Sequence, residues 1–344
     1  MSNVSEFYVA CRNGDLTKFN QIVSTLSTDE LNRLEPNGST ALHAASFYGH
    51  SQIVRHLLKR EDILLSIRNR YNKTPCEEAR TSEIEQLFNR SSASARNRFI
   101  EDTSEPVWTF CGKHADLIAQ NNYADMYLCD LDTTISELNW ATRKVSAQYV
   151  NCVKYFLKKL QCTRDVTYLL RLYTAETDFY RLLNEAIATR YSAACRMLQK
   201  DTQWAMFFAS IVSRDTALDQ FRCTELVTYR GMRITDTDLS KYEVGGKIMN
   251  RSFLSTSTDR NVALKFLKSP TIDGKLDVLC TYTIVDRRAA LDIHSVSEFP
   301  KEQEVLIVPW MAFVVKRKEL KHPIEIELEQ LPMEEDLVDL NTHL

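Results

Sequence analysis

The spacing of apolar residues changes along this chain of 344 residues. In residues 51–58 the apolar positions fall on one face of a helix. Helical spacing then dominates from about residue 105 to residue 222, most clearly in 149–160 and 166–188. After residue 223 the period becomes two and turn residues appear, which indicates strands. The pattern therefore predicts helices in the first two thirds of the chain and a sheet in the last third.

The strands that we predict lie at residues 226–230, 276–285, 303–308, 313–315 and 323–329. In the last of them isoleucine or leucine alternates with glutamate, from Ile324 to Glu329. Such alternation is typical of a strand with one wet face, so we do not interpret the acidic residues as a separate acidic tail. Helices followed by neighbouring strands predict an α+β arrangement with a mostly antiparallel sheet.

One helical segment recurs. Residues 38–49 run Gly-Ser-Thr-Ala-Leu-His-Ala-Ala-Ser-Phe-Tyr-Gly, with the Thr40 hydroxyl placed to begin a helix and Gly49 placed to end it. Thr74 follows Thr40 by 34 residues, and Gly14 precedes Gly49 by 35 residues. The segment resembles the ankyrin repeat, whose period is about 33 residues; the alternative is an ordinary helical hairpin. Because three repeats are near the minimum for a stable stack, we expect the array to pack against something else, either the rest of this chain or another protein.

The segment at residues 90–98 is polar and poor in large apolar residues, which is typical of a linker. We therefore predict ankyrin repeats over 1–90, a linker over 91–104, a helical region over 105–222, a β-rich core over 223–335 and a tail over 336–344. The expected fold is multidomain, with an all-α repeat stack followed by an α+β domain.

Composition narrows the class of protein. Hydrophobic residues make up 44% and charged residues 26%, and the net charge of −3 argues against nucleic-acid binding by bulk electrostatics. The N-terminus has no basic and apolar leader, and no apolar run approaches the ~20 residues of a membrane span. Nine scattered cysteines indicate reduced thiols, and Cys111 with His114 makes only one lone pair of metal ligands. We expect a cytoplasmic protein without a metal, a membrane or a nucleic acid as partner.

Three short elements follow one another in the predicted sheet: Tyr229-Arg230-Gly231, Ser255-Thr256-Ser257 and Glu302-Gln303-Glu304. Taken singly they are ordinary, because such residues usually form a turn, a loop and one solvated strand face. In this order they resemble the Arg, Ser-x-Ser, Glu-x-Glu signature of the arginine-specific mono-ADP-ribosyltransferases.

Two longer segments extend the resemblance, which covers roughly residues 165–315. Residues 171–184 are similar to the helical segment that precedes the sheet in those enzymes, and residues 299–307 to their acceptor-recognition loop. Phe266, eleven residues after Ser255, stands where such enzymes often carry an aromatic residue against the nicotinamide. Its alternative role is that of a core aromatic, since its neighbours are apolar. The resemblance implies a helical lobe joined to a mostly antiparallel NAD-binding core.

The resemblance also implies NAD⁺ as co-substrate, with catalytic residues Arg230, Ser255, Glu302 and Glu304 and no metal. Arg230 would clamp a phosphate, because its fork of donors matches phosphate oxygens. Gly231 would let the backbone approach the nicotinamide carboxamide, Ser255 would support Glu304 and the ribose, and Phe266 would pack on the nicotinamide ring. Glu304 would stabilise the oxocarbenium-like transition state of glycosidic cleavage.

Glu302 implies arginine as the acceptor. Since Glu302 and Glu304 are two residues apart, where a loop meets a strand, both side chains can point to one side, with Glu302 beside the guanidinium of the acceptor. The predicted partners are a protein with an exposed arginine and an unidentified ankyrin-binding protein. Two alternatives stay open: an NAD⁺ glycohydrolase on the same site, and a catalytically inactive ankyrin adaptor. A Rossmann domain is excluded, because the chain has eight glycines and no G-x-G-x-x-G after a strand.

Overall fold

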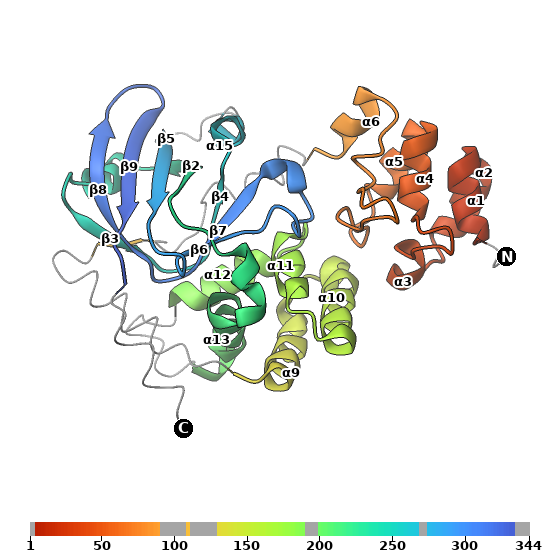
Figure 1. Ribbon diagram of the computed structural model, residues 1–344, viewed down its shortest axis with the longest axis horizontal. Helices are drawn as coiled ribbons and strands as arrows, with labels where there is room; N and C mark the ends of the chain where they lie inside the picture. The colour runs from red at the N-terminus through yellow and green to blue at the C-terminus, as the bar shows by residue number, and fades with distance from the viewer. Residues whose placement is uncertain (1–3, 90–107, 111–128, 190–198, 268–273, 334–344) are drawn as a thin grey trace.

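The computed structural model describes residues 4–89, 108–110, 129–189, 199–267 and 274–333. Figure 1 shows the N-terminal helices on one side, the sheet on the other, and a second group of helices packed against the sheet. The predicted linker, the Cys111 and His114 pair and the tail lie outside the described residues. None of the helices within the described ranges has the length and apolar character that crossing a membrane requires.

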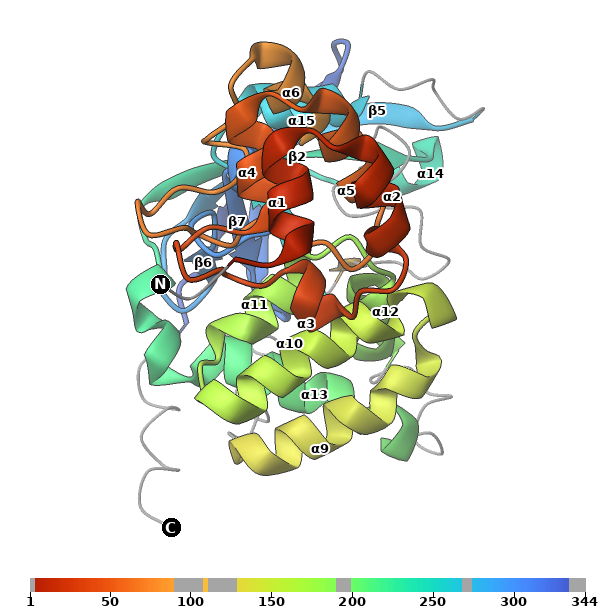
Figure 2. The same ribbon diagram turned by 90° about the vertical axis from the view of Figure 1, so that its right-hand side faces the viewer.

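The N-terminal helices form the predicted ankyrin array (Figure 2). They are α1 (Glu6–Asn13), α2 (Leu16–Val23), α3 (Thr28–Leu31), α4 (Ala41–Tyr48), α5 (Ser51–Leu57) and α6 (Ser82–Leu87). Thr40 caps α4 by accepting the His43 N–H, and Gly14 and Gly49 end α1 and α4 with φ of 73° and 88°. These positive φ values explain why glycine stands at both helix ends. The helices enclose a hydrophobic cluster of their own.

The third repeat is shorter than its sequence suggests. Residues 75–78 form a turn instead of the helix that the alignment with α4 predicts, although Thr74 and Glu77 still make the reciprocal bonds of a helix start. The next helix, α6, begins at Ser82, so the chain has no room for a second full turn before it.

A helical lobe follows. It contains α9 (Leu131–Ala141), η2 (Thr142–Lys144), η3 (Ala147–Tyr149), α10 (Val150–Thr163), α11 (Thr167–Thr174), α12 (Phe179–Thr189), α13 (Gln199–Arg214) and η5 (Thr216–Phe221). The segment with helical spacing over 166–188 forms two helices, α11 and α12, because Ala175 leaves the helical region with ψ of 148°. The region predicted to be helical also holds one strand, β1 (Trp108–Phe110), which is too short to show a period of two.

Within the residues that the structure describes, the sheet has nine strands in the order β1-β3-β8-β9-β5-β2-β4-β7-β6. The further strands are β2 (Leu226–Ile234), β3 (Lys247–Asn250), β4 (Leu254–Ser257), β5 (Leu276–Ile284), β6 (Ala290–Asp292), β7 (Glu304–Ile307), β8 (Ala312–Glu319) and β9 (Ile324–Gln330), with α14 (Asp236–Ser240), α15 (Arg260–Leu267) and η6 (Pro300–Glu302) between them. Every pairing is antiparallel except that of β5 with β9.

The sheet thus confirms the α+β class with a mostly antiparallel core. The five predicted strands correspond to β2, β5, β7, β8 and β9. The strands that the pattern missed, β1, β3, β4 and β6, have three or four residues each, which is too few for alternation to show. The helical lobe and the sheet share one large hydrophobic cluster, and Leu64 of the ankyrin array belongs to it. The array therefore packs against the rest of the chain at Leu64.

Candidate active site

The three signature elements lie on adjacent strands in the middle of the sheet. Ser257 of β4 is registered with Tyr229 of β2 on one side and with Glu304 of β7 on the other. β4 and β7 pair along four residues, and β2 and β5 along nine. In contrast, β2 and β4 share only the pair Tyr229 and Ser257. The two halves of the sheet are thus joined at one point, beside the arginine of the first element.

Arg230 spans this junction. Its side chain is 4% exposed, and Nη1 donates to the carbonyl oxygen of Ser255 at 2.6 Å. The guanidinium therefore bonds a strand carbonyl next to the junction of β2 and β4. A guanidinium stays charged at any working pH, so the fold places a permanent positive charge inside the protein.

Ser255 is buried at the start of β4 and faces a tyrosine from the helical lobe. Its Oγ lies 3.4 Å from the hydroxyl of Tyr173, and Asn184 Nδ2 donates to the same hydroxyl at 3.3 Å. Tyr173 on α11 and Asn184 on α12 were not among the residues assigned from the sequence. Both lie within residues 171–184, the segment already singled out by resemblance, which is the signal that could have identified them.

Gly231 has a packing reason for lacking a side chain. A Cβ at this position would lie 2.9 Å from the carbonyl oxygen of Ala263 and 3.0 Å from Leu267, both on α15. The glycine lets α15 approach β2 closely, and Ala263 and Leu267 form a small buried cluster there with Leu279. Its approach to a nicotinamide stays a prediction. Phe266 also belongs to α15, but its side chain lies outside the described residues.

The two glutamates of the third element have different environments. Glu304 begins β7 and is completely buried, whereas Glu302 ends the turn η6 and is partly exposed. Between them, Gln303 has a φ of 44°, which is left-handed backbone. Strand alternation requires extended backbone, so it does not apply across Gln303, and the expectation that both side chains point to one side stays a prediction. Any cooperation between them depends on the shape of this turn.

Ser257 and Thr258 hold that turn against the end of β4. Ser257 Oγ donates to the carbonyl of Glu302 at 2.7 Å, and the N–H of Thr258 donates to the carbonyl of Gln303 at 3.1 Å. The Thr258 hydroxyl also donates to the side chain of Gln303 at 2.9 Å. Sequence reasoning gave no role to Ser257 beyond the pattern. In the fold it ties the second element to the third.

These groups match the chemistry of NAD⁺ as a substrate. A guanidinium suits a pyrophosphate, hydroxyls suit a ribose, and a buried carboxylate suits the positive charge that develops on a ribose during cleavage. Arg230, Ser255 and Glu304 supply one group of each kind on three neighbouring strands. Within the described ranges, no group of three or more His, Cys, Asp or Glu residues is arranged to hold a metal ion.

No curated protein matches the chain. Solved structures do: the Vis toxin from Vibrio splendidus is 17% identical over 64% of this chain and 86% of its own, with a TM-score of 0.38. HopU1 of Pseudomonas syringae pv. tomato is 14% identical over 60% and 99%, with a TM-score of 0.44. The effector XopAI of Xanthomonas axonopodis pv. citri is 16% identical over 67% and 100%, with a TM-score of 0.42. With TM-scores this low, these likenesses carry no argument about function.

The family assignment comes from sequence profiles. The profile of ankyrin repeats in three copies matches residues 7–89. The profile described as NAD:arginine ADP-ribosyltransferase matches residues 119–335, which include the helical lobe and all three signature elements. Members of this family use NAD⁺ as co-substrate. The chain therefore belongs to the NAD:arginine ADP-ribosyltransferase family and carries an N-terminal ankyrin array.

Proposed function

We propose that this protein transfers one ADP-ribose unit from NAD⁺ to an arginine side chain of another protein and releases nicotinamide. The observation that supports this most is the register of β2, β4 and β7, which brings Arg230, Ser255 and Glu304 onto adjacent strands at the point where the sheet halves join. Membership of the family supports the donor, and Glu302 supports arginine as the acceptor.

The proposed reaction breaks the bond between C1′ of the ribose and the nicotinamide nitrogen. The bonding electrons leave with nicotinamide, which departs neutral, so no general acid is required. Positive charge develops on the ribose, and the buried carboxylate of Glu304 stabilises it. Arg230 holds a phosphate by charge-assisted hydrogen bonds, and Ser255 supports the ribose and Glu304.

A guanidine nitrogen of the acceptor then bonds to C1′ and loses a proton. A guanidinium has a pKa above 12 and is a poor nucleophile while protonated, so a carboxylate beside it assists the attack. Glu302 supplies this group from a partly exposed turn, where a protein acceptor could reach it. The carboxylate orients the guanidinium and takes the proton as the new bond forms.

The test uses the purified full chain with NAD⁺ labelled on the adenosine. Nicotinamide release is measured alone and with a small guanidine such as agmatine, and transfer of label to the guanidine is measured in parallel. We expect label on the guanidine and faster nicotinamide release in its presence. Release without any transfer would instead support the glycohydrolase, and neither activity would support the inactive adaptor.

The protein acceptor can be found by the same chemistry. Labelled protein in a lysate would be digested and the modified residues identified by mass spectrometry. Modification at cysteine or at carboxylates, with arginine unmodified, would contradict the acceptor that we propose while leaving the transferase activity intact.

A further inference from the structure

The ankyrin array contacts the catalytic half at the segment that leads into Glu302. Glu298, four residues earlier, is 3% exposed. Its Oε2 accepts the N–H groups of Leu65 at 2.7 Å and Ser66 at 3.1 Å, and its Oε1 accepts the Ser66 hydroxyl at 2.5 Å. A buried carboxylate is stable only when such donors surround it, and all three of these donors come from the array.

The array in turn depends on Glu298. The loop after α5 turns three consecutive backbone N–H groups inward. Asn32 Oδ1 accepts the first, from Leu64, at 2.8 Å. The next two, from Leu65 and Ser66, go to Glu298. Because a buried N–H without an acceptor is costly, the array and the segment before Glu302 complete each other.

Ser66 extends the link to the helical lobe. Arg171 Nη1 on α11 donates to the Ser66 hydroxyl at 2.6 Å, so this hydroxyl accepts from Arg171 and gives its one hydrogen to Glu298. The N–H of Glu298 donates to Thr174 Oγ1, also on α11, at 3.0 Å. The same helix carries Tyr173, which faces Ser255. The Ser66 hydroxyl of the array thus joins α11 to residues 298–302, the acceptor segment.

A second contact lies three residues further on. Lys301 forms an ion pair with Glu85 of α6, with Nζ and Oε1 2.5 Å apart. The hydrogen bond to Lys301 lowers the pKa of the Glu85 carboxyl. Both side chains are about half exposed, at 46% and 51%, so this pair contributes little by itself. It nevertheless places the array at both ends of residues 298–301, directly before Glu302.

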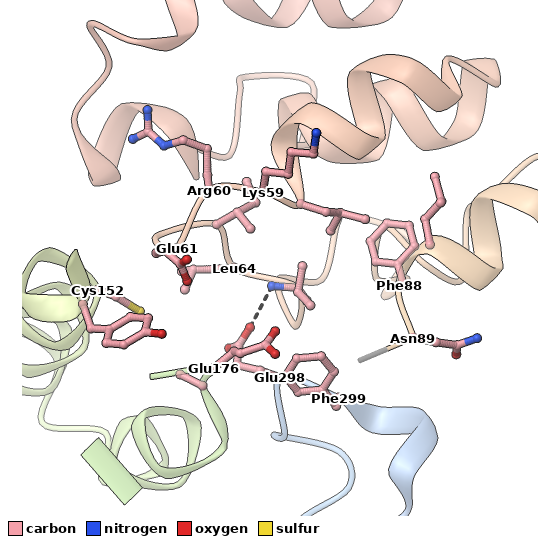
Figure 3. A pocket seen from close by; sticks show the side chains of 16 residues that line it. Lys59, Arg60, Glu61, Leu64, Phe88, Asn89, Cys152, Glu176, Glu298 and Phe299 are labelled. Carbon is pink, nitrogen blue, oxygen red and sulfur yellow. Dashed lines mark hydrogen bonds between the residues drawn. The ribbon is translucent and has the colours of Figure 1, made fainter. Parts of the chain in front are cut away.

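Between these contacts the two halves do not pack continuously. A cavity of about 440 Å³ separates them, with Leu64 and Phe88 of the array on one side and Cys152, Glu176 and Phe299 on the other. Figure 3 shows Glu298 bonded at its edge and Phe299 beside it. The array is therefore attached to the acceptor segment by a few separate hydrogen bonds, so a single substitution can break this attachment.

We propose that the ankyrin array forms part of the acceptor site. Through Ser66 and Glu298 it fixes the segment that carries Glu302, and so it sets the affinity for an arginine acceptor and the efficiency of transfer to it. Cleavage of NAD⁺ remains the task of Arg230, Ser255 and Glu304. Ser66 and Glu298 are positioning residues, since they act through Glu302. The inference rests on the proposed function, because it takes Glu302 as the acceptor carboxylate.

The test compares transfer with hydrolysis in the full chain. Ser66→Ala removes the hydroxyl, and Glu298→Gln brings an NH₂ group against the N–H donors of Leu65 and Ser66. In both we expect the acceptor KM to rise, and the ratio of transfer to NAD⁺ hydrolysis to fall about tenfold, because charge-assisted hydrogen bonds are lost. Ser66→Thr keeps the hydroxyl and should restore most of the ratio.

Two controls separate positioning from general damage. Ser46→Ala removes a buried hydroxyl in α4 that makes no hydrogen bond within the described part of the chain. Asp29→Asn weakens another contact between the halves, the ion pair with Lys158 at 2.6 Å, which is remote in sequence from residues 298–303. Both should keep the wild-type ratio. An unchanged ratio in folded Ser66→Ala and Glu298→Gln, or an equal fall in Asp29→Asn, would overturn the proposal.

Hydrogen exchange of the backbone amides of Phe299 and residues 301–303 provides a readout that needs no activity. Exchange there should rise in Ser66→Ala and Glu298→Gln and stay unchanged in Ser46→Ala. If the wild-type protein releases no nicotinamide, the proposed function fails, and exchange still decides whether the array holds the segment. Unchanged exchange in both variants would show that it does not.

Discussion

The motif residues of the ankyrin array and the motif residues of the sheet have different roles. In the array, Thr40 and Gly49 begin and end a helix, and the fold itself needs them. In the sheet, Arg230 and Glu304 are charged groups that are 4% and 0% exposed. Burying charge does not favour folding. The difference teaches that buried charges, which folding alone does not favour, indicate chemistry, while caps and glycines indicate architecture.

This comparison predicts that substitutions of the buried charges in the sheet cost activity, and that substitutions of the helix caps and glycines in the array cost stability. Unfolding of the array and unfolding of the catalytic half can be measured separately. All four tryptophans lie outside the array, at positions 108, 140, 204 and 310. Tryptophan fluorescence therefore reports unfolding of the catalytic half, and far-ultraviolet circular dichroism reports the helices of both halves.

The largest effect is expected at Glu304. Glu304→Gln removes the carboxylate that stabilises the transition state, and both transfer and hydrolysis should fall by about 10²–10³, as when one preorganised electrostatic group is lost. Glu302→Gln is the matched variant, which removes the same charge two residues away. It should lose transfer to arginine and keep much of the hydrolysis, since water needs no carboxylate to orient it.

Nicotinamide release and label transfer would be measured side by side for both glutamate variants. Equal losses of the two activities in Glu302→Gln would refute the division of labour between the carboxylates. Robust hydrolysis in Glu304→Gln would remove the assignment of the site altogether.

The next effect is on NAD⁺ binding. Arg230→Ala should weaken binding by about 1.5–3 kcal/mol, the usual size of a hydrogen bond to a charged group, and change the rate on bound substrate less. Calorimetry with NAD⁺ measures the affinity, and single-turnover kinetics measure the rate on the bound substrate. If the affinity is unchanged, Arg230 is better explained by its bond to the Ser255 carbonyl as a brace between strands.

Gly231 is an exception to this comparison, because it belongs to the signature in the sheet and yet has a packing role. A Cβ there meets the backbone of α15, so Gly231→Ala should destabilise the catalytic half by about 1–3 kcal/mol, as overpacking usually does. Denaturant unfolding followed by tryptophan fluorescence measures this. A normal midpoint with a raised KM for NAD⁺ would instead assign the glycine to the nicotinamide alone.

The smallest effect concerns pH and the array. Burial lowers the pKa of His43 below its ordinary value of 6.5, against the weaker influence of the Lys73 carbonyl and Glu78. The neutral ring accepts from the N–H of Thr40 and bonds the Lys73 carbonyl at 2.9 Å. The unfolded chain takes up the proton at higher pH than the folded chain. This stabilisation is therefore complete above about pH 6.5 and is lost as the pH falls towards the folded-state pKa.

Urea unfolding of the array, followed by circular dichroism, should show a midpoint that falls with pH in this window. His43→Gln should remove the dependence, whereas His56→Gln, which changes an exposed histidine of α5, should keep it. The fluorescence midpoint of the catalytic half serves as the internal reference. The same slope in His43→Gln as in the wild type would attribute the dependence to other groups.

Sequence patterns gave much of the fold and part of the site. The repeat spacing placed Gly14 and Gly49 at helix ends, and alternation located the longer strands, because both signals lie within a few residues. The same reasoning failed for the short strand β4, which the Ser-Thr-Ser pattern suggested as a loop. It also gave no sign that the helical segment over 166–188 is divided at Ala175.

The candidate site was harder to predict from the sequence, since its residues come together only through the pairing of strands that are far apart in the chain. The order of the three elements indicated the family, but nothing local gives the left-handed Gln303, which separates Glu302 from Glu304. Glu298, which faces Ser66, shows no signal in the sequence, and the contact of Tyr173 with Ser255 could be suspected only from the resemblance of residues 171–184. Such contacts depend on packing between segments far apart in the chain.

The sequence by itself determined two structural units, the repeat and the helical lobe. It also determined the chemical groups of the candidate site: an arginine, two serines and two glutamates in the order of the family. The tertiary structure alone decided which of these groups are buried, which strands carry them side by side, and that the array holds Glu298. The physical reason is that propensity and periodicity act over a few residues. Burial and hydrogen bonding of a charged side chain depend instead on every segment that folds around it.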